Sequence, residues 1–438
     1  MTMTASALAQ RVGDAIRDAV SGFAVPGAQG AWYCDGVAEE LAVGAVTPAT
    51  RIPIGSATKV FTASLAIQLV GDGALALDEP IVDALPAGRC REVLGGVTLR
   101  QLLTHTSGLE DDPVAAGEPC GSPSEYVRAC TRERLFPAGE HFSYANAGYV
   151  VAGHLVERAM EQRWAEGVRA FLLDPLDARG TFFLSERPAP GVVAEGHVRR
   201  PEGEVQALAG PSRLGRAWGP ACGLALSASD LLRMLCLHLD DGRTAQGFSL
   251  LDAGLVREMR TPAVSVPDPS FADAWGVGWA LQGGGSDAGW FGHDGDDEGW
   301  TARARASADR GFAIVMLANC LPADREWRRL LDALRPLGLD VGEPTVPWPP
   351  LHAAPIDPDV AGRYENGDMR LAVVEHDGEF WLVGGQERVP LRSIGDDRCL
   401  AVPADRREAP FVVAFLRDGD GRVRYVNHLG RVAGRVAA

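Results

Sequence analysis

A proline-rich stretch near residue 350 divides the chain into two unequal parts. Proline lacks a backbone N–H and has a fixed φ, so a stretch this rich in it forms neither a helix interior nor a central strand. We therefore expect a linker over residues 344–358, a large domain over residues 1–343 and a small domain over residues 359–438. The prolines of the linker are Pro344, Pro347, Pro349, Pro350, Pro355 and Pro358.

The large part carries strand patterns at both ends and helical patterns between them. Apolar residues at helical spacing predict an amphipathic helix over residues 5–21, and a hairpin pattern follows over residues 27–46. The order of these patterns predicts an α/β core with an all-helical insert. Further helices are expected over 56–70, 149–160, 164–173, 227–240 and 325–337, and further strands over 275–281, 299–306 and 311–319.

Short strand patterns around Asp-Gly turns fill the small part. The turns lie at Asp377-Gly378 and at residues 418–421, and apolar or alternating segments flank them. This pattern predicts a small antiparallel β domain of barrel-like form. Its expected strands lie over 369–374, 379–383, 411–416 and 422–427.

The acidic composition excludes two classes of partner. The net charge is −16, whereas nucleic acids and anionic membranes bind basic surfaces, so neither is expected as a partner. No apolar run reaches the roughly 20 residues that span a bilayer. Arg11, Asp14 and Arg17 interrupt the one candidate secretory signal, so we expect a cytoplasmic protein.

The eight cysteines are widely separated, without the paired spacing of a zinc site. Because cytoplasmic cysteines are mostly reduced, we expect no disulfides. The sequence likewise indicates no metal and no other cofactor.

A serine and a lysine three residues apart are the first candidate catalytic pair. Ser56 and Lys59 would lie one turn apart on one face of a helix start, where burial and the helix N-terminus lower the pKa of the amine. A neutral amine accepts the serine proton and makes the hydroxyl a nucleophile. Lys59 is the only lysine in the chain, and arginine cannot replace it as a base because arginine keeps its proton. The alternative is a surface lysine without a role.

Two further short motifs carry candidate catalytic side chains. Tyr144 can relay a proton to the leaving group, and Asn146 can hold the lysine and a substrate carbonyl. His293, with glycines close on both sides, can donate to a developing charge or to a substrate carbonyl. Taken singly, these motifs also fit a capping turn and a structural histidine, and we assign His105 a bracing role in a turn. No G-x-S-x-G elbow, H-E-x-x-H motif or phosphate loop competes with them.

Taken in order and spacing, the motifs resemble those of the serine β-lactamase and penicillin-binding-protein superfamily in its class C-like form. The resemblance covers roughly residues 5–340 and implies an α/β sandwich beside a helical subdomain, with the site in the cleft between them. It also implies an oxyanion hole from the backbone N–H groups of Ser56 and Asp296. The motifs are Gly55-Ser-Ala-Thr-Lys59, the segment 102–109, Tyr144-Ala-Asn146, the segment 223–230 and Gly292-His-Asp-Gly295.

The third motif departs from the lactam-binding pattern of the superfamily. His293 stands where many members carry lysine in a K-T-G triplet, which argues against β-lactam hydrolysis. The H-x-G form resembles esterases, D-amino-acid peptidases and the penicillin-binding-protein-type thioesterases. The last group, stand-alone cyclases that release nonribosomal peptides, is similar in having this core followed by a small lipocalin-like β domain.

This resemblance, together with the expected cytoplasmic location, favours a peptide cyclase. Ser56 would take a peptidyl group from a carrier-protein thioester, and the N-terminal amine of the peptide would attack the acyl-enzyme to close a macrolactam. The superfamily implies a D-configured acylating residue. The expected partner is a carrier-protein-bound or other thioester peptide, and the sequence does not determine the oligomeric state.

Two alternatives stay open. A family VIII-type esterase or a D-aminopeptidase would pass the acyl group to water, and a binding protein on the same fold would be catalytically idle. Candidate substrate contacts are Trp300, Arg431 and Arg435. The alternative interpretation is that the tryptophan belongs to the core and that the two arginines are solvated. The chain also has an acidic run, which is either solvated or able to attract an ammonium group. It consists of Asp294, Asp296, Asp297 and Glu298.

Overall fold

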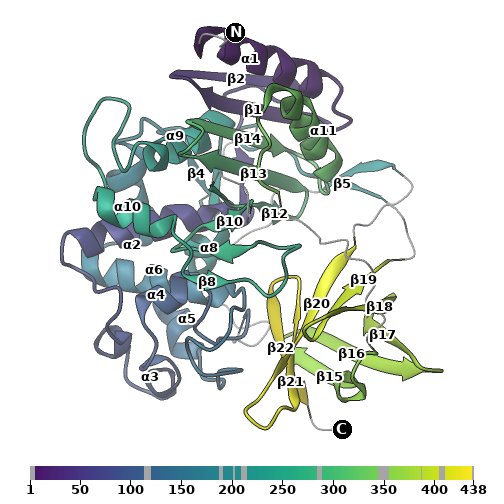
Figure 1. Cartoon of the computed structure of the whole chain (residues 1–438). Coiled ribbons are helices and arrows are strands. Elements are labelled where there is room, and N and C mark those ends of the chain that lie inside the picture. The colour runs from purple at the N-terminus through teal and green to yellow at the C-terminus, as the bar shows by residue number, and fades with distance from the viewer. Residues whose placement is uncertain are drawn as a thin grey trace.

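Two bodies of different architecture make up the chain, a large layered body and a smaller barrel (Figure 1). The computed structural model describes residues 5–112, 120–186, 191–200, 203–208, 215–283, 289–343, 355–385, 387–403 and 410–436. Among these residues, no helix combines the length and the apolar character needed to cross a bilayer.

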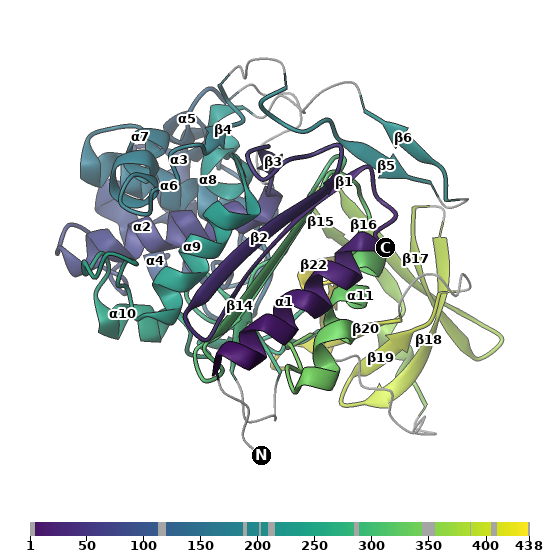
Figure 2. The ribbon, with the colours of Figure 1, turned by 90° about the horizontal axis from the view of Figure 1, so that it is seen from above.

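An antiparallel sheet of nine strands, counted over the described residues, forms the centre of the large body. Every residue of the middle strands β13 (Trp300–Ser307) and β14 (Phe312–Ala318) is buried, so both faces of the sheet must be covered. Helices α1 (Ala5–Ser21) and α11 (Asp324–Leu334) cover one face, and α9 (Ala228–Leu239) packs on the other (Figure 2). The strand order is β2 (Val37–Gly44), β1 (Gly27–Cys34), β14, β13, β11 (Trp290–Gly292), β10 (Ala280–Gln282), β9 (Ala274–Trp275) and β8 (Val264–Ser265), with β12 (Gly295–Asp297) also paired to β13.

The helical region lies against the face of the sheet that α9 covers (Figure 2). Its central helix α2 (Lys59–Gly71) is apolar on nearly all sides, which is typical of a helix in the interior. Helices α6 (Asn146–Met160) and α8 (Gly219–Cys222) contact α2, and both later contribute to the site. Its other helices are α3 (Arg89–Leu94), α4 (Leu99–Leu103), α5 (Pro123–Ala129), α7 (Trp164–Val168) and α10 (Ala253–Met259).

Two small sheets accompany these layers. The first joins β3 (Ile52–Pro53), β7 (Leu224–Leu226) and β4 (Phe182–Phe183), and it leads directly into the site. The second is a hairpin of β5 (His197–Arg199) and β6 (Val205–Ala207).

Eight antiparallel strands close into the C-terminal barrel. Closure pairs the first strand with the last and leaves no free sheet edge. Buried side chains such as Tyr364, Phe380 and Phe415 fill its core. The strands are β15 (Gly362–Asn366), β16 (Met369–His376), β17 (Glu379–Gly384), β18 (Glu387–Gly395), β19 (Arg398–Ala401), β20 (Phe411–Arg417), β21 (Val423–His428) and β22 (Arg431–Val436).

The expected fold class, an α/β body with a helical subdomain and a barrel-like β domain, is confirmed. Three expected segments differ in detail. The single strand over 275–281 is wrong, because Gly276 and Gly278 turn the chain between β9 and β10, and Gly278 has a φ of +91°. The helix expected over 56–70 begins with a 3₁₀ turn, η1 (Gly55–Thr58), and the one over 164–173 ends in a π-helical turn (Arg169–Leu173).

Most of the expected linker, residues 344–354, lies outside the described residues. The chain beyond it enters the short 3₁₀ helix η6 (Pro358–Val360) just before the barrel. The three domain boundaries therefore stay a prediction.

Candidate active site

Ser56 lies where strand β3 leads into helix α2. Gly55 has a φ of +49°, a left-handed conformation that glycine adopts without a Cβ penalty. A Cβ at Gly55 would lie 2.9 Å from the carbonyl oxygen of Asp296, so the chain passes β12 at a distance that only glycine allows. This sharp turn places Ser56 in η1, three residues before Lys59.

The amine of Lys59 is buried and makes three hydrogen bonds. Its Nζ lies 3.0 Å from Ser56 Oγ, 2.7 Å from Asn146 Oδ1 and 3.0 Å from the carbonyl oxygen of Ala221. Burial lowers the pKa of Lys59 from 10.5 to about 8, although the Asp111 carboxylate acts in the opposite direction. With that pKa, roughly a tenth of the amine is neutral at pH 7, which lets it accept the Ser56 proton.

Tyr144 lies just before helix α6, close to both Ser56 and Lys59. Its ring centroid is 5.0 Å from Lys59 Nζ, and its hydroxyl forms a hydrogen bond with Ser56. Burial raises the pKa of Tyr144 above its ordinary value of 10.0, and the hydrogen bond with Ser56 only partly opposes this. The phenol therefore keeps its proton near neutral pH and can donate it to a leaving group.

His293 approaches Tyr144 from the sheet, with ring centroids 6.3 Å apart. Its Nδ1 lies 2.6 Å from the carbonyl oxygen of Asp294, and because a carbonyl only accepts, Nδ1 carries the ring proton. Burial, followed by the charge on Lys59, lowers the pKa of His293 to about 3, so the ring is neutral. Nε2 then presents a lone pair, without a partner among the described residues. His293 was expected to donate a hydrogen bond to the substrate, but in this arrangement its Nε2 is an acceptor.

Strand β12 brings the backbone of Asp296 against the turn that carries Ser56. A Cβ at Gly295 would lie 1.8 Å from the carbonyl oxygen of Ile54 and 3.0 Å from the backbone nitrogen of Ala57. The two backbones are therefore in direct contact at the point where an oxyanion hole from Ser56 and Asp296 requires them. The role of these N–H groups itself stays a prediction.

Arg431 reaches the site from the barrel. It begins strand β22, and its guanidinium carbon lies 5.7 Å from the centroid of the Tyr144 ring. Its Nη2 lies 3.1 Å from Oδ2 of Asp111. The preceding residue, Gly430, accepts a hydrogen bond from the backbone N–H of Tyr144 at 2.9 Å. Of the three expected substrate contacts, Arg431 is the one that the structure brings to the catalytic side chains.

Asp111 is a site residue that the motifs do not indicate. Its Oδ1 accepts from the backbone N–H of Asn146 at 2.9 Å and from Nδ2 of Asn146 at 3.0 Å. Asn146 lies 35 positions further along the chain, and Arg431 lies in another body. Sequence motifs describe residues that are close together in the chain, so they do not indicate contacts between such distant positions. The one clue in the sequence is that Asp111 follows the 102–109 segment.

The other two expected substrate contacts make hydrogen bonds within the fold, and a role in substrate binding stays a prediction for them. Trp300 is 1% exposed and its indole N–H donates to the carbonyl oxygen of Ala194 at 3.1 Å, so it belongs to the core. Arg435 donates to Asp359 and to the carbonyl oxygen of Ala361, and so it ties η6 to strand β22. Both side chains use their donors within the fold.

Two carboxylates of the acidic run form ion pairs within the fold. Asp294 pairs with Arg305 and Asp296 with Arg303, and both arginines are buried on β13. These carboxylates balance arginine charge, which leaves them unsuited to attract a substrate ammonium group. Burial raises the pKa of Asp297, and its Oδ2 has no partner among the described residues, so within the run this carboxylate stays open to a donor.

His105 braces the site, as its place in a turn suggested. Its φ is +56°, and its Nδ1 accepts a hydrogen bond from the backbone N–H of Ala145 at 3.1 Å. Its ring stacks on Tyr144 with centroids 4.2 Å apart. His105 therefore fixes both the ring of Tyr144 and the start of α6.

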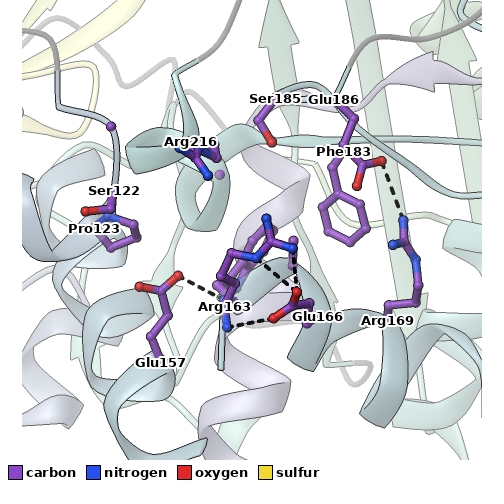
Figure 3. A pocket seen from close by; sticks show the side chains of 15 residues that line it. Ser122, Pro123, Glu157, Arg163, Glu166, Arg169, Phe183, Ser185, Glu186 and Arg216 are labelled. Carbon is purple, nitrogen blue, oxygen red and sulfur yellow. Dashed lines mark hydrogen bonds and ion pairs between the residues drawn. The ribbon is translucent and has the colours of Figure 1, made fainter. Parts of the chain in front are cut away.

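A charged cavity of about 410 Å³ lies in the helical region, next to α7 and α8 (Figure 3). Arg163 pairs with Glu166, and Nη2 of Arg169 lies 3.6 Å from Oε2 of Glu186. The charges that line the cavity therefore largely balance one another. The cavity shares helix α8 with the site, but none of the predicted catalytic residues lines it. Among the described residues, no group of three His, Cys, Asp or Glu side chains is placed to hold a metal ion.

The fold and the site together define a class of protein. A serine hydroxyl beside a buried lysine amine, with a tyrosine and an asparagine at the start of a second helix, is the arrangement of active-site-serine acyl-transfer proteins. The chain belongs to the β-lactamase family of serine hydrolases, because the family model described as Beta-lactamase matches residues 10–337.

Three relatives show how far this likeness extends. Penicillin-binding protein 4 of Amycolatopsis lactamdurans is 33% identical over 358 residues, 78% of this chain and 93% of that protein. Esterase EstB of Burkholderia gladioli is 30% identical over 268 residues, 52% of this chain and 66% of that protein. The structure also matches the crystal structure of SurE with a TM-score of 0.86, over 98% of this chain and 99% of SurE, and the two sequences are 34% identical. A crystal structure of SurE with D-Leu, 32% identical, covers 98% of this chain and all of SurE with a TM-score of 0.84.

Proposed function

We propose that this chain is a serine acyl-enzyme peptide cyclase, which releases a nonribosomal peptide from a carrier-protein thioester by head-to-tail macrolactam formation. The observation that carries the proposal is the likeness to SurE over 98% of the chain, which includes the barrel as well as the catalytic core. The barrel also contacts Tyr144 through Gly430 and Arg431. An acyl group on Ser56 would therefore form beside a surface that the barrel helps to shape.

The proposed reaction balances without water or a cofactor. Ser56 Oγ attacks the thioester carbonyl carbon while neutral Lys59 takes the serine proton, and the C–S bond then breaks as the thiolate is protonated by the Tyr144 hydroxyl. The amine at the other end of the peptide attacks the resulting ester and gives up one proton to the Lys59–Tyr144 pair. The C–O bond to Ser56 breaks, Oγ regains a proton, and the products are a lactam and a thiol.

The stereochemistry of the acylating residue is part of the proposal. One crystal structure of SurE contains D-Leu, and that structure is 32% identical to this chain over nearly its whole length. This supports a D-configured residue at the carbonyl that Ser56 attacks. The partner that we propose is a peptidyl carrier protein or another thioester of the linear peptide.

Mass spectrometry on a linear peptide thioester mimic tests the cyclase. With a D-residue at the C-terminus, we expect a product one water lighter than the linear acid, and the epimer with an L-residue is the matched control and should react more slowly. The Ser56→Ala variant should give neither product. Predominant linear acid from the D-substrate would contradict cyclisation.

Hydrolysis is the second candidate, favoured by the 30% identity to an esterase. In that reaction water replaces the amine as the second nucleophile, and the same assay separates the two outcomes. Covalent labelling of Ser56 by a fluorophosphonate tests the remaining alternative, because a catalytically idle binding protein would stay unlabelled.

A further inference from the structure

Asp111 connects the barrel to the start of helix α6. Its backbone N–H donates to Oδ1 of Asn366 on β15 at 3.1 Å, and its Oδ2 lies 3.1 Å from Arg431 at the start of β22. On its other side, Oδ1 accepts from Asn146 and the carbonyl oxygen accepts from the N–H of Ala147 at 3.1 Å. Every polar group of this residue is therefore used, two toward the barrel and two toward α6.

The carboxylate fixes which way the Asn146 amide faces. A carboxylate only accepts, so Nδ2 of Asn146 must point to Asp111, which leaves Oδ1 to accept from Lys59 at 2.7 Å. The same carboxylate takes the N–H of the first residue of α6, whose N-cap, Ala145, has no side chain that can cap. A negative charge at a helix N-terminus is also favourable. Asp111 thus caps α6 and orients Asn146 at once.

The barrel holds the other end of this arrangement in place. The N–H of Val432 donates to Ser143 Oγ at 3.1 Å, and Gly430 accepts from Tyr144. These bonds set Arg431 between the Tyr144 ring and Asp111. The guanidinium charge is therefore held beside the carboxylate by backbone contacts on both sides of it.

Asp111 and Arg431 differ from the other groups that face Lys59. Burial raises the pKa values of the thiol and of the phenols near the amine, and it lowers those of the imidazoles, so these groups are neutral at pH 7. Within the described part of the chain, Asp111 and Arg431 are then the charged groups that act on the amine, in opposite directions. The neutral groups are Cys222 on α8, Tyr144 and Tyr149 at α6, His105 after α4, and His293 before β12.

We propose that Asp111 is a positioning residue that couples the barrel to the catalytic lysine. Its carboxylate holds the Asn146 amide toward Lys59, and Arg431 of the barrel balances its charge. The proposal rests on the proposed function in one respect, that Lys59 is the base for Ser56. It assigns the barrel a part in the acylation site itself, in addition to any contact with substrate.

The test uses the single lysine of the chain as its own reporter. In full-length protein labelled with [13Cε]lysine, one side-chain signal reports Lys59, and its shift against pH gives the pKa without any need for activity. Asp111→Asn removes the charge that raises the pKa, so its midpoint should fall. Arg431→Gln removes the charge that lowers it, so its midpoint should rise. We expect each shift to be about 0.5 pH unit or more, and the double variant to lie near the wild type.

A matched ion pair in the barrel provides the control. Arg435 and Asp359 also lie 3.1 Å apart, but they contact neither Asn146 nor Tyr144 in the hydrogen bonds described above. Asp359→Asn and Arg435→Gln should leave the Lys59 midpoint unchanged. If the neutral variant at Asp111 fails to fold, the rise of the midpoint expected in Arg431→Gln still tests the proposal by itself.

The outcomes separate this proposal from the proposed function. Midpoints that move in the same direction in both single variants, or that do not move, would overturn the role of Asp111 even if peptide is cyclised. Opposite shifts in a protein that neither labels at Ser56 nor turns over thioester would support the coupling and contradict the enzymatic assignment.

Discussion

At the scale of single residues, Lys59 is the position where composition and geometry agree best. A chain that uses arginine elsewhere keeps one lysine, and the structure buries its amine against Ser56, Asn146 and the Ala221 carbonyl. Burial costs the charged form of an amine more than the neutral form, which is why the pKa of Lys59 falls to about 8. A guanidinium in the same place would stay charged.

The pKa of Lys59 predicts a pH dependence for acylation of Ser56. The neutral amine is the active form, so the labelling rate with a fluorophosphonate should rise about tenfold per pH unit below pH 8 and level off above it. Lys59→Arg should lower the rate by about 1,000-fold above pH 8 and should remove the rise with pH, because arginine stays charged. The reverse exchange at a surface site, Arg179→Lys, should leave it unchanged. A profile that is flat between pH 6 and 9 would show that Lys59 is not the base.

At the scale of elements, the site depends on the contact between strand β12 and the turn η1. Two short backbone segments meet there because Gly55 and Gly295 have no Cβ. The contact holds strand β12 of the nine-stranded sheet against the 3₁₀ turn that precedes α2. A methyl group at Gly295 would separate the two segments, because it would meet the backbone of Ile54 and Ala57.

Gly295→Ala should therefore impair acylation more than folding. Its Cβ would meet the Ile54 carbonyl oxygen at 1.8 Å, so the strand must move away from Ser56. Loss of one oxyanion donor costs about 100-fold in rate, and we expect a loss of this size in single-turnover labelling. Gly96→Ala is the control, because its Cβ would meet nothing within 4 Å. Equal rates in the two variants would contradict an oxyanion role for this strand.

At the scale of the whole molecule, both bodies contain histidines that stay neutral, fully buried in the large body and half-buried in the barrel. Burial lowers the pKa of His238 and His293 to about 3 and that of His428, in the barrel, to about 4. In the unfolded chain these rings titrate near 6.5. Below that pH the unfolded state binds more protons than the folded state, so the free energy of unfolding falls as the pH falls.

We accordingly predict acid destabilisation between pH 6.5 and about 3, measured as urea unfolding at a series of pH values. Each such histidine contributes up to about 1.4 kcal/mol per pH unit. In His238 both ring nitrogens are engaged, with Ser64 and with the indole N–H of Trp279, so His238→Gln should reduce the slope against pH. His376→Gln, at an exposed position, should not. A free energy of unfolding that is constant over this range would contradict the prediction.

Features that repeat locally along the chain can be predicted from the amino-acid sequence. Helical and strand spacing predicted the α/β body and the barrel-like domain, and the pair Ser56 and Lys59 was evident because three residues span one helical turn. The segment over 275–281 was assigned wrongly because its apolar residues fit a strand, while its glycines turn the backbone into a hairpin.

Contacts between residues that are distant in the sequence become known only from the folded arrangement. Arg431 lies at the site whereas Arg435 is used within the barrel, and no sequence pattern distinguishes two arginines four positions apart on one strand. The role of Asp111 and the ring proton of His293 also depend on hydrogen bonds that form only after the two bodies and the sheet are assembled. Local spacing reports the conformation of a segment, whereas charge balance and proton position are set by whichever groups the complete fold brings within hydrogen-bonding distance.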